Sequence, residues 1–344
     1  MPNQKRVIIH VNHPTLQLPV WQNQLAESIK SPDVLIKALN LPATLLPKLE
    51  KAHKMFPLRV TQSYLDKIEK GNINDPLLRQ ILPLAEETII TKGYTTDPVE
   101  DKQFEKTPGL LHKYHGRVLL TLTGACGIHC RYCFRRHFDY SASNPSKQNW
   151  RAALEYIKND NSIYEVIFSG GDPLSLSDQR LSKLAHDIDQ ITHLRFLRIH
   201  TRQITILPDR VDEHLLEWIS RLRLKLIMVV HINHPNEIDQ LTSSSLGKLR
   251  KIGVELLNQS VLLQGVNNEV NTLTQLSLKL IENGVKPYYL HMLDKAQGTA
   301  HFNVAESDAI NIIKMMQEKL PGYAIPKLVR EVPFTPYKKP INVS

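Results

Sequence analysis

The chain has 344 residues, of which 42% are hydrophobic and 22% charged, and its formal net charge at pH 7 is +9. This is the composition of an ordinary globular protein with a sizeable core, and no apolar stretch approaches the roughly 18 to 20 residues that cross a bilayer. Residues 1–11 lack the long apolar region and the cleavage site of a secretory signal, so we expect a cytoplasmic protein without a membrane partner.

The positive charge is dispersed along the chain. Basic residues form only short groups such as Arg135-Arg136 and Lys338-Lys339, and there is no tail of like charges. A basic chain suits a nucleic-acid partner, but it equally suits an enzyme for anionic cofactors. We therefore interpret the basic residues as a solvated surface and expect no nucleic-acid partner.

Residues 1–105 have no regular strand spacing and are expected to be helical. An apolar stripe formed by Val60, Tyr64 and Ile68 predicts one helix there, ending at Gly71. Such a stripe is most simply the buried face of a helix in a hydrophobic core.

From residue 117 onward, short apolar runs alternate with longer amphipathic segments, which is typical of βα units around a parallel sheet. The six predicted strands are residues 118–123, 166–169, 196–200, 226–230, 256–261 and 288–292. Helices are expected to begin near Asn149, Ser177, Asp209, Ser243, Thr272 and Ala305. Six βα units fit a partial barrel, in which functional residues gather at the carboxyl ends of the strands.

All three cysteines of the chain lie within eight residues, directly after the first predicted strand. Cys126, Cys130 and Cys133 have the spacing CxxxCxxC. Thiolates suit iron-sulfur clusters, and three ligands on a four-iron cluster leave one iron open to a small molecule. The alternatives are a zinc site completed by His129 or His137, and three buried thiols without a metal.

Glycine and polar residues stand at the ends of later strands. Ser169-Gly170-Gly171-Asp172 follows the second strand, where glycine lets the backbone approach a ligand closely. Alone, this segment is equally typical of a tight strand-to-helix turn. His231 and Asp294 follow the fourth and sixth strands.

The cysteine motif resembles that of the radical S-adenosylmethionine (SAM) superfamily, in which the open iron binds SAM and cleaves it to a carbon radical. Further segments are similar to lysine 2,3-aminomutases, namely residues 111–114, 116–119, 130–138, 231–237 and 259–265. Other segments look like the bacterial branch of that family that makes (R)-β-lysine for elongation factor P, namely residues 71–80, 108–114, 257–263 and 288–295.

The resemblance implies an α/β fold, a partial (β/α)6 radical SAM barrel with a helical N-terminal segment and a C-terminal extension that binds pyridoxal phosphate (PLP). The corresponding division is residues 1–105 for the helical segment, 106–320 for the barrel and 321–344 for the C-terminal PLP-lysine segment. The implied cofactors are a 4Fe-4S cluster, SAM and PLP. Longer catabolic aminomutases carry additional cysteines for a structural zinc, and this chain has none to spare.

The resemblance also assigns residues to the cofactors. The cluster is expected on Cys126, Cys130 and Cys133, and SAM on Ser169, Gly170, Gly171, Asp172, His231 and Gln259. Lys113 and Arg117 match groups that hold the PLP phosphate. Lys338 corresponds to the lysine that carries PLP as a Schiff base. Lys339 remains a competitor and Lys327 a more distant one, because this chain lacks the glycine-rich stretch that precedes that lysine in catabolic relatives.

Three residues match substrate-binding positions of the family. Arg135 corresponds to the residue that grips the substrate carboxylate, for which a planar guanidinium fork is well shaped. Asp294 and Glu331 correspond to two acidic positions that pair with the distal ammonium of lysine, with Glu331 in place of an aspartate. Without the resemblance, Asp294 and Glu331 could each simply be a surface or strand-end carboxylate.

The resemblance thus implies a radical SAM and PLP-dependent isomerase that converts L-lysine to (R)-β-lysine. Its product would pass to a β-lysine ligase that modifies elongation factor P, and its electron donor would be a flavodoxin or ferredoxin. The nearest alternative is a catabolic free-lysine 2,3-aminomutase. A more distant one is an iron-sulfur protein that binds nucleic acid, which would explain the charge of +9 but neither the acidic pair nor the C-terminal lysines.

Overall fold

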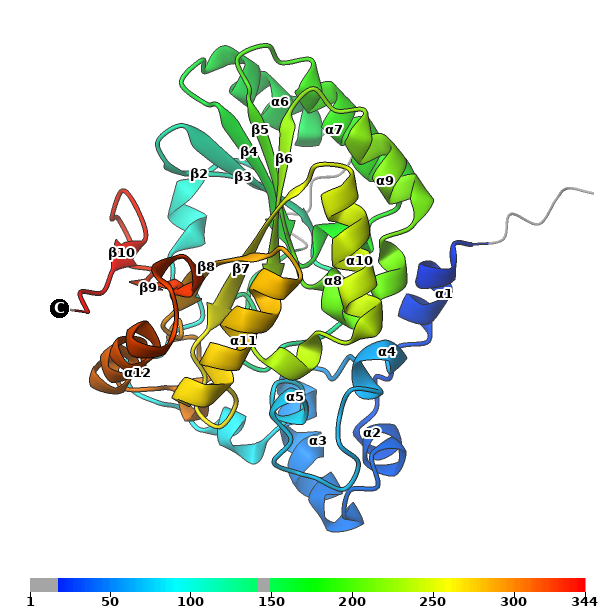
Figure 1. Ribbon diagram of the computed structural model, residues 1–344. Coiled ribbons are helices and arrows are strands. Elements are labelled where there is room, and N and C mark those ends of the chain that lie inside the picture. Colours follow the sequence, from blue (N-terminus) through cyan, green and yellow to red (C-terminus); the bar gives the residue numbers. More distant parts are fainter. Residues whose placement is uncertain (1–17, 141–148, 344) are drawn as a thin grey trace, which may run out of the picture.

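The computed structural model describes residues 18–140 and 149–343, so the residues that bear on a secretory signal lie outside it. Ten strands form one sheet in chain order (Figure 1). The described strands that run parallel are β3 (Arg117–Thr123), β4 (Glu165–Gly170), β5 (Phe196–Thr201), β6 (Lys225–His231), β7 (Glu255–Val261), β8 (Lys286–His291) and β9 (Lys327–Arg330). The sheet is completed by the antiparallel strands β1 (Glu105–Thr107), β2 (Leu110–Tyr114) and β10 (Lys339–Pro340).

The six predicted strands are confirmed as β3 to β8. Side chains of a strand alternate between its two faces, and β5 shows this strictly from Phe196 to Thr201. Leu197 and Ile199 are fully buried against the helices, whereas the side chains between them face the interior of the curved sheet. A single strand therefore serves both the core and the site.

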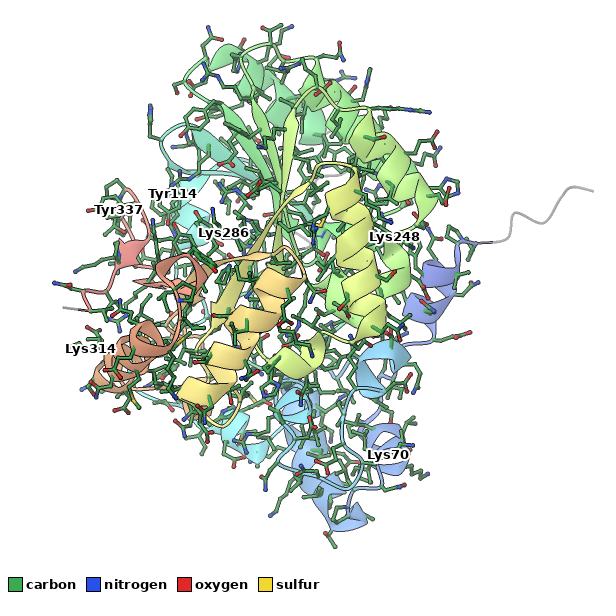
Figure 2. The ribbon with its side chains drawn as sticks, viewed as in Figure 1. Lys70, Tyr114, Lys248, Lys286, Lys314 and Tyr337 are labelled. Atoms are coloured by element: carbon green, nitrogen blue, oxygen red, sulfur yellow. The ribbon has the colours of Figure 1, made fainter. Side chains whose placement is uncertain are left out.

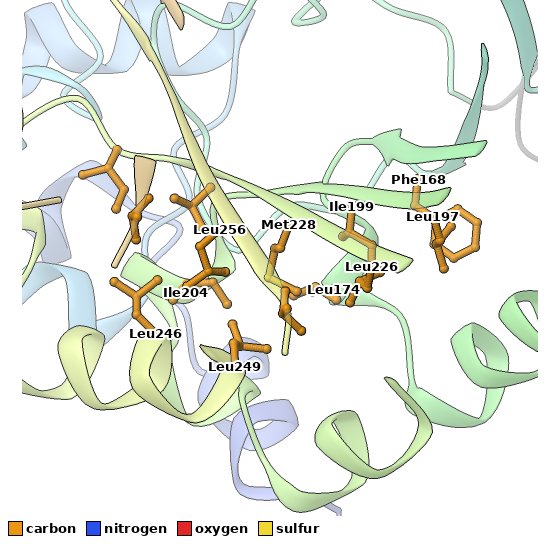
Figure 3. Close-up of a cluster of buried hydrophobic side chains, with 14 of the residues drawn as sticks. Phe168, Leu174, Leu197, Ile199, Ile204, Leu226, Met228, Leu246, Leu249 and Leu256 are labelled. Atoms are coloured by element: carbon orange, nitrogen blue, oxygen red, sulfur yellow. The ribbon is translucent and has the colours of Figure 1, made fainter. Parts of the chain in front are cut away.

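Six helices cover the outer face of the sheet, each following one of the strands β3 to β8 (Figure 1). They are α6 (Asn149–Asn159), α7 (Asp178–Asp189), α9 (Glu213–Ser220), α10 (Gln240–Lys251), α11 (Val270–Glu282) and α12 (Glu306–Lys319). Buried Ile199 and Met228 from the strands pack with Leu246 and Leu249 from α10 in the main core (Figure 3). The α/β partial barrel is thus confirmed, with all six helices in their expected places.

The strands at the margins of the sheet were not predicted. β9 pairs in parallel with β8, with Lys327 opposite Tyr289. β10 returns antiparallel, with Lys339 opposite Arg330. The C-terminal segment therefore continues the sheet, and Glu331, Tyr337 and Lys338 between its two strands line the barrel interior. The division of the chain into three parts stays a prediction.

The N-terminal segment contains short helices, as the sequence predicted in outline. They are α1 (Val20–Ala26), α2 (Pro32–Ala38), α3 (Leu46–Met55), α4 (Gln62–Leu65) and α5 (Pro76–Arg79). A second hydrophobic core around Trp21, Leu35 and Tyr64 also includes Ile206 and Leu207, which follow β5 in the barrel. The helical segment is therefore packed onto the barrel.

The predicted helix between Val60 and Gly71 is wrong in length, since α4 covers only Gln62–Leu65. Val60 is taken by a β-bridge to Ile29. Beyond the helix, the backbone amide of Gly71 donates to the carbonyl of Leu39 at 2.7 Å instead of capping α4. Long-range pairing has overridden the local apolar spacing.

A buried ion-pair cluster ties the N-terminal segment to the cysteine loop, residues 124–134. Glu87 accepts hydrogen bonds from Arg131 Nε at 2.8 Å and Nη2 at 2.6 Å, and from Arg136 Nη2 at 2.7 Å. The three side chains are at most 1% exposed. Phe56 of the N-terminal segment contacts both guanidinium groups, at 4.8 and 4.7 Å from its ring centre. One carboxylate thus balances two buried cations.

We expect Glu87→Gln to lower the free energy of unfolding by about 3 to 5 kcal/mol, because it leaves two buried guanidinium groups without a counter-charge. Urea denaturation followed by circular dichroism measures the change. Glu86→Gln is the matched control, since Glu86 is exposed and its loss should matter by less than about 0.5 kcal/mol. Equal stability of the two variants would contradict the expectation.

Two features of the described structure concern membrane spans and surface charge. No described helix has both the length and the apolar character needed to cross a membrane. The exposed lysines Lys70, Lys248 and Lys314 lie on the N-terminal segment, α10 and α12, well apart on the molecule (Figure 2). These positions agree with the dispersed charge of the sequence.

Candidate active site

A cavity of about 390 Å³ lies inside the curved sheet. Arg117 begins β3 and Cys126 follows its end, so the cavity, which both residues line, runs along the whole strand. Every predicted site residue lines it: Lys113, Arg117, Cys126, Cys130, Cys133, Arg135, Ser169, Gly170, Gly171, Asp172, His231, Gln259, Asp294, Glu331 and Lys338. The structure therefore brings together residues that are separated by up to 225 positions, from Lys113 to Lys338.

The three cysteine thiols lie at the carboxyl end of the strands and are free. Burial raises the pKa of Cys133 to about 11 and raises that of Cys126 well above its ordinary value. Such thiols stay protonated at neutral pH unless a bound metal stabilises their thiolates. Three partly buried sulfurs on one loop therefore fit the donor set of an iron-sulfur cluster.

Within residues 18–140 and 149–343, no three or more His, Cys, Asp or Glu side chains are arranged to hold a single metal ion. A 4Fe-4S cluster does not require that arrangement, because each cysteine thiolate binds a different iron.

The glycine turn after β4 packs directly against the cysteine loop. Gly170 has a φ of +118°, and a Cβ there would stand 2.7 Å from the carbonyl oxygen of Thr123. A Cβ on Gly171 would stand 2.5 Å from the carbonyl oxygen of Ala125. The backbone amide of Gly171 donates to Thr123 at 2.6 Å. Only glycine allows the turn to lie this close to the loop, and this leaves bare backbone at the cavity wall.

Asp172 is more constrained than the sequence suggested. Its carboxylate accepts hydrogen bonds from the Thr201 hydroxyl at 2.8 Å, the Arg202 backbone amide at 2.7 Å and the Leu174 amide at 3.0 Å. Burial raises its pKa to about 6. In the described structure Asp172 joins the ends of β4 and β5, and its contact with SAM stays a prediction.

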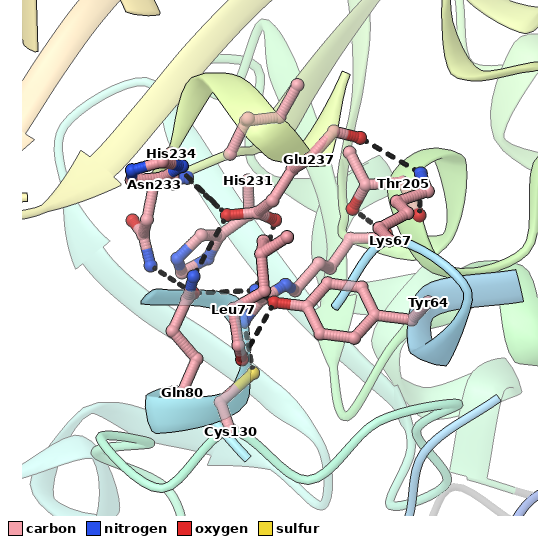
Figure 4. A network of polar contacts seen from close by, with 12 residues as sticks. Tyr64, Lys67, Leu77, Gln80, Cys130, Thr205, His231, Asn233, His234 and Glu237 are labelled. Carbon is pink, nitrogen blue, oxygen red and sulfur yellow. Dashed lines mark hydrogen bonds and ion pairs between the residues drawn. The ribbon is translucent and has the colours of Figure 1, made fainter. Parts of the chain in front are cut away.

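Arg202 directly follows β5, is buried, and bonds to residues of a polar network beside the cysteine loop. Figure 4 shows this network around Tyr64, Gln80, Cys130 and Glu237. Its Nη1 donates to Cys130 Sγ at 2.8 Å. Its Nη2 donates to Gln80 Oε1 at 2.7 Å, Glu237 Oε2 at 3.0 Å and the Tyr64 hydroxyl at 3.1 Å. The network holds a permanent positive charge against the Cys130 sulfur and anchors that charge to the N-terminal segment.

His231 and Gln259 stand opposite each other on β6 and β7. Burial, together with the nearby Arg202 charge, lowers the pKa of His231 to about 3, so its imidazole is neutral at pH 7. Its Nε2 lies 3.3 Å from the Tyr132 hydroxyl. Both side chains present neutral polar groups to the cavity, which fits contacts to an uncharged part of a ligand.

An alternating chain of charges lines the other part of the cavity. Arg135 pairs with Asp101, Asp101 approaches Lys113, Lys113 pairs with Glu331 at 3.1 Å, and Glu331 pairs with Lys338 at 2.8 Å. Burial alone would raise the pKa of Glu331, but Lys338, Tyr114 and Lys113 hold it at about 2. These groups satisfy one another in the ligand-free protein.

The geometry favours Lys338 over the two competing lysines. Lys338 is partly buried and lines the cavity, whereas Lys339 and Lys327 are exposed and do not line it. β10 pairs Lys339 with Arg330 on the neighbouring strand, which leaves the preceding residue to face the interior.

Two other charged residues of the cavity have no oppositely charged partner at hydrogen-bond distance in the described residues. The guanidinium of Arg117 lies over the ring of Tyr114, 4.8 Å from its centre, and forms no ion pair with a described residue, so its cation is open to an anion such as a phosphate. Burial raises the pKa of Asp294 to about 7, although the Lys338 charge opposes this rise. A carboxyl in this state gains most from an incoming cation.

The sequence did not reveal Asp101, Tyr114 or Arg202 as site residues. Tyr114 adjoins the predicted Lys113 and donates to Glu331, so the motif that flagged Lys113 also contained it. Arg202 lies two residues after the third predicted strand, so the rule that strand ends carry function could have pointed there. Asp101 had no such signal, because it lies in a short 3-10 helix ahead of the barrel.

Comparison with known proteins identifies the family of this chain. The Radical SAM superfamily matches residues 120–274. L-lysine 2,3-aminomutase of Escherichia coli is 45% identical over 98% of this chain and 98% of its own length. The Haemophilus influenzae protein of the same name is 46% identical over 92% of this chain and 94% of its own length. That of Clostridium subterminale is 32% identical over 93% and 77%. The chain belongs to the lysine 2,3-aminomutase family of radical SAM enzymes.

Proposed function

We propose that this protein converts L-lysine to (R)-β-lysine with a 4Fe-4S cluster, SAM and PLP as cofactors. The observation that carries the proposal is the single cavity in which the three cysteines meet Lys338 and the carboxylates Asp294 and Glu331. When bound, the cluster and SAM supply a carbon radical, and PLP supplies a π system that stabilises the rearranging substrate.

At the cluster end, the chain would hold the cluster, shape the binding site for SAM and shield the radical. Cys126, Cys130 and Cys133 are the ligands we assign, and Arg202 steadies the middle one. The glycine turn offers backbone groups without side chains to a ligand on the open iron. The curved sheet and Phe56 of the N-terminal segment line this region, which matters because a carbon radical abstracts hydrogen from any C–H or S–H bond that it can reach.

At the substrate end, the charged groups of lysine and PLP would replace ion pairs that the cavity side chains form with one another. We assign Arg135 to the lysine carboxylate, and Asp294 with Glu331 to the side-chain ammonium. Lys113 and Arg117 are suited to a phosphate, and Lys338 to a covalent bond with PLP. Glu331 pairs with Lys338 and Lys113, so its surroundings already suit a cation such as the ammonium of lysine.

We expect Asp294→Asn to stabilise the ligand-free protein increasingly as the pH rises. The pKa of Asp294 is raised from 3.8 to about 7 in the folded state. Between these values the folded state binds more protons at this site than the unfolded state, so the parent loses stability as the pH rises. Thermal melting at about pH 5 and about pH 8 measures this, and an equal difference between variant and parent at both pH values would contradict it.

The direct test is turnover by protein reconstituted anaerobically with iron, sulfide and PLP, then supplied with SAM, lysine and dithionite. Chiral chromatography should show (R)-β-lysine that forms only when SAM and reductant are both present. A fully loaded protein that leaves lysine unchanged would overturn the proposal.

For its place in the cell, we infer that the enzyme acts in the cytoplasm, takes electrons from a flavodoxin or ferredoxin, and supplies β-lysine for elongation factor P. Residues 71–80, 108–114, 257–263 and 288–295, which resemble that branch in sequence, support this inference. A β-lysine ligase encoded beside the gene, and loss of modified elongation factor P on deletion, would distinguish it from a catabolic aminomutase.

A further inference from the structure

Asp101 is a buried carboxylate inside the cavity for which the proposed reaction has no direct use. It begins the short 3-10 helix Asp101–Phe104 and is 5% exposed. Its Oδ2 accepts two hydrogen bonds from Arg135, from Nε at 3.0 Å and from Nη2 at 2.9 Å. Its Oδ1 lies 3.9 Å from Lys113 Nζ. One carboxylate thus contacts residues assigned to two different ligands.

The contact fixes how Arg135 is presented. Asp101 occupies the edge of the guanidinium formed by Nε and Nη2, and the remaining terminal nitrogen, Nη1, donates to Ser169 Oγ at 3.2 Å. The rings of Phe134 and Phe138 lie 4.8 and 6.0 Å from the guanidinium carbon. The side chain is therefore held on several sides, with its Nη1 directed toward the cavity residue Ser169.

Orientation of this kind decides how well an arginine reads a carboxylate. A guanidinium can present different edges, and only an edge turned to the ligand can donate two parallel hydrogen bonds to it. A ligand-binding side chain works best when neighbouring hydrogen bonds lock it in place. Without the Asp101 carboxylate, the edge of Arg135 formed by Nε and Nη2 would lose both of its hydrogen bonds.

We propose that Asp101 is a positioning residue that orients Arg135 toward the substrate carboxylate, a proposal that rests on the proposed function. Asp101 also couples Arg135 to Lys113, which we assign to the cofactor phosphate. Asp101 does not touch the substrate. It acts through Arg135, so it controls the preference for an amino acid with a free α-carboxylate over one without.

The test compares binding of L-lysine with that of L-lysinamide, which has no carboxylate, by isothermal calorimetry on protein that carries the cluster and PLP. The parent is expected to prefer lysine, and Asp101→Asn to lower that preference by about 10- to 100-fold. In an Arg135→Lys background, which already lacks the guanidinium fork, Asp101→Asn should change the preference little. A general structural defect would weaken both ligands alike and leave the ratio intact.

Glu100→Gln is the matched control. It removes the same charge from the neighbouring residue, whose side chain bonds only to Gln103 in the described structure and lies outside the cavity wall. Its preference should equal that of the parent. If Asp101→Asn does not fold, Asp101→Glu carries the same test, because it shifts the carboxylate by one methylene and should give a smaller loss of preference.

The outcomes separate the inference from the function on which it rests. A parent protein that binds lysine and prefers it over lysinamide, with the same preference in the Asp101 variants, overturns the inference alone. A parent that binds neither ligand overturns the proposed function, and the inference with it.

Discussion

Replacing Cys130 with serine is expected to abolish lysine turnover and to leave the protein without a stable 4Fe-4S cluster. The sequence contains three cysteines, so no other thiol can substitute. A serine hydroxyl is a far weaker acid than a thiol, and its oxygen is a harder ligand than sulfur. It therefore does not form the soft thiolate bonds that iron-sulfur clusters require. Iron and sulfide content after anaerobic reconstitution, with the visible spectrum, measures the loss. Cys126→Ser and Cys133→Ser should behave in the same way.

His137→Ala is the control for this series. His137 is exposed, lies outside the cavity wall and contacts the carbonyl of Gln297 at 3.1 Å. The variant should keep the full iron content, whereas a zinc site completed by His137 would lose its metal. Retention of both iron and turnover in any cysteine variant would refute the assignment of the ligands.

Lys338→Ala is expected to abolish turnover and to remove covalently bound PLP. Only an amine that reaches the cavity can form the Schiff base with the cofactor, and Lys338 has its side chain there beside Glu331. Borohydride reduction followed by peptide mapping should label Lys338 in the parent protein. The cluster should form normally in the variant, because the cysteines lie at the other part of the cavity.

The competing lysines provide the matched controls. Lys339→Ala and Lys327→Ala remove the same type of charge from exposed positions, and both should keep PLP and turnover. A phosphopyridoxyl label on either of them, with Lys338 unmodified, would show that the register of the C-terminal segment was assigned wrongly.

What the sequence could predict was local. The strands β3 to β8 have apolar runs that no other arrangement explains, and the cysteines stand within one short loop, so spacing alone revealed them. Lys338 depended on a resemblance, because nothing in a Lys-Lys pair distinguishes a buried amine from an exposed one. Its burial is set by pairing between β9 and β10, which brings Lys339 opposite Arg330.

What the sequence missed depends on contacts between distant segments. The bond from Arg202 to Cys130 spans 72 positions, and that from Arg135 to Asp101 spans 34. No periodicity records such pairs, since each partner is an ordinary polar residue in its own segment. The helix predicted from Val60 onward is wrong for the same reason, because Val60 forms a β-bridge with Ile29.

The sheet is open, and its two margins bear on how the protein behaves at high concentration. An unpaired strand edge is a template for another chain, and long apolar edges lead to aggregation. Here the outermost strands are three residues long, Glu105–Thr107, and two residues long, Lys339–Pro340. One margin is charged, and the other contains a proline, which has no amide hydrogen to donate. We therefore expect the protein not to aggregate through its sheet margins, although the sheet does not close. Neither margin offers a neighbouring molecule enough backbone to pair with.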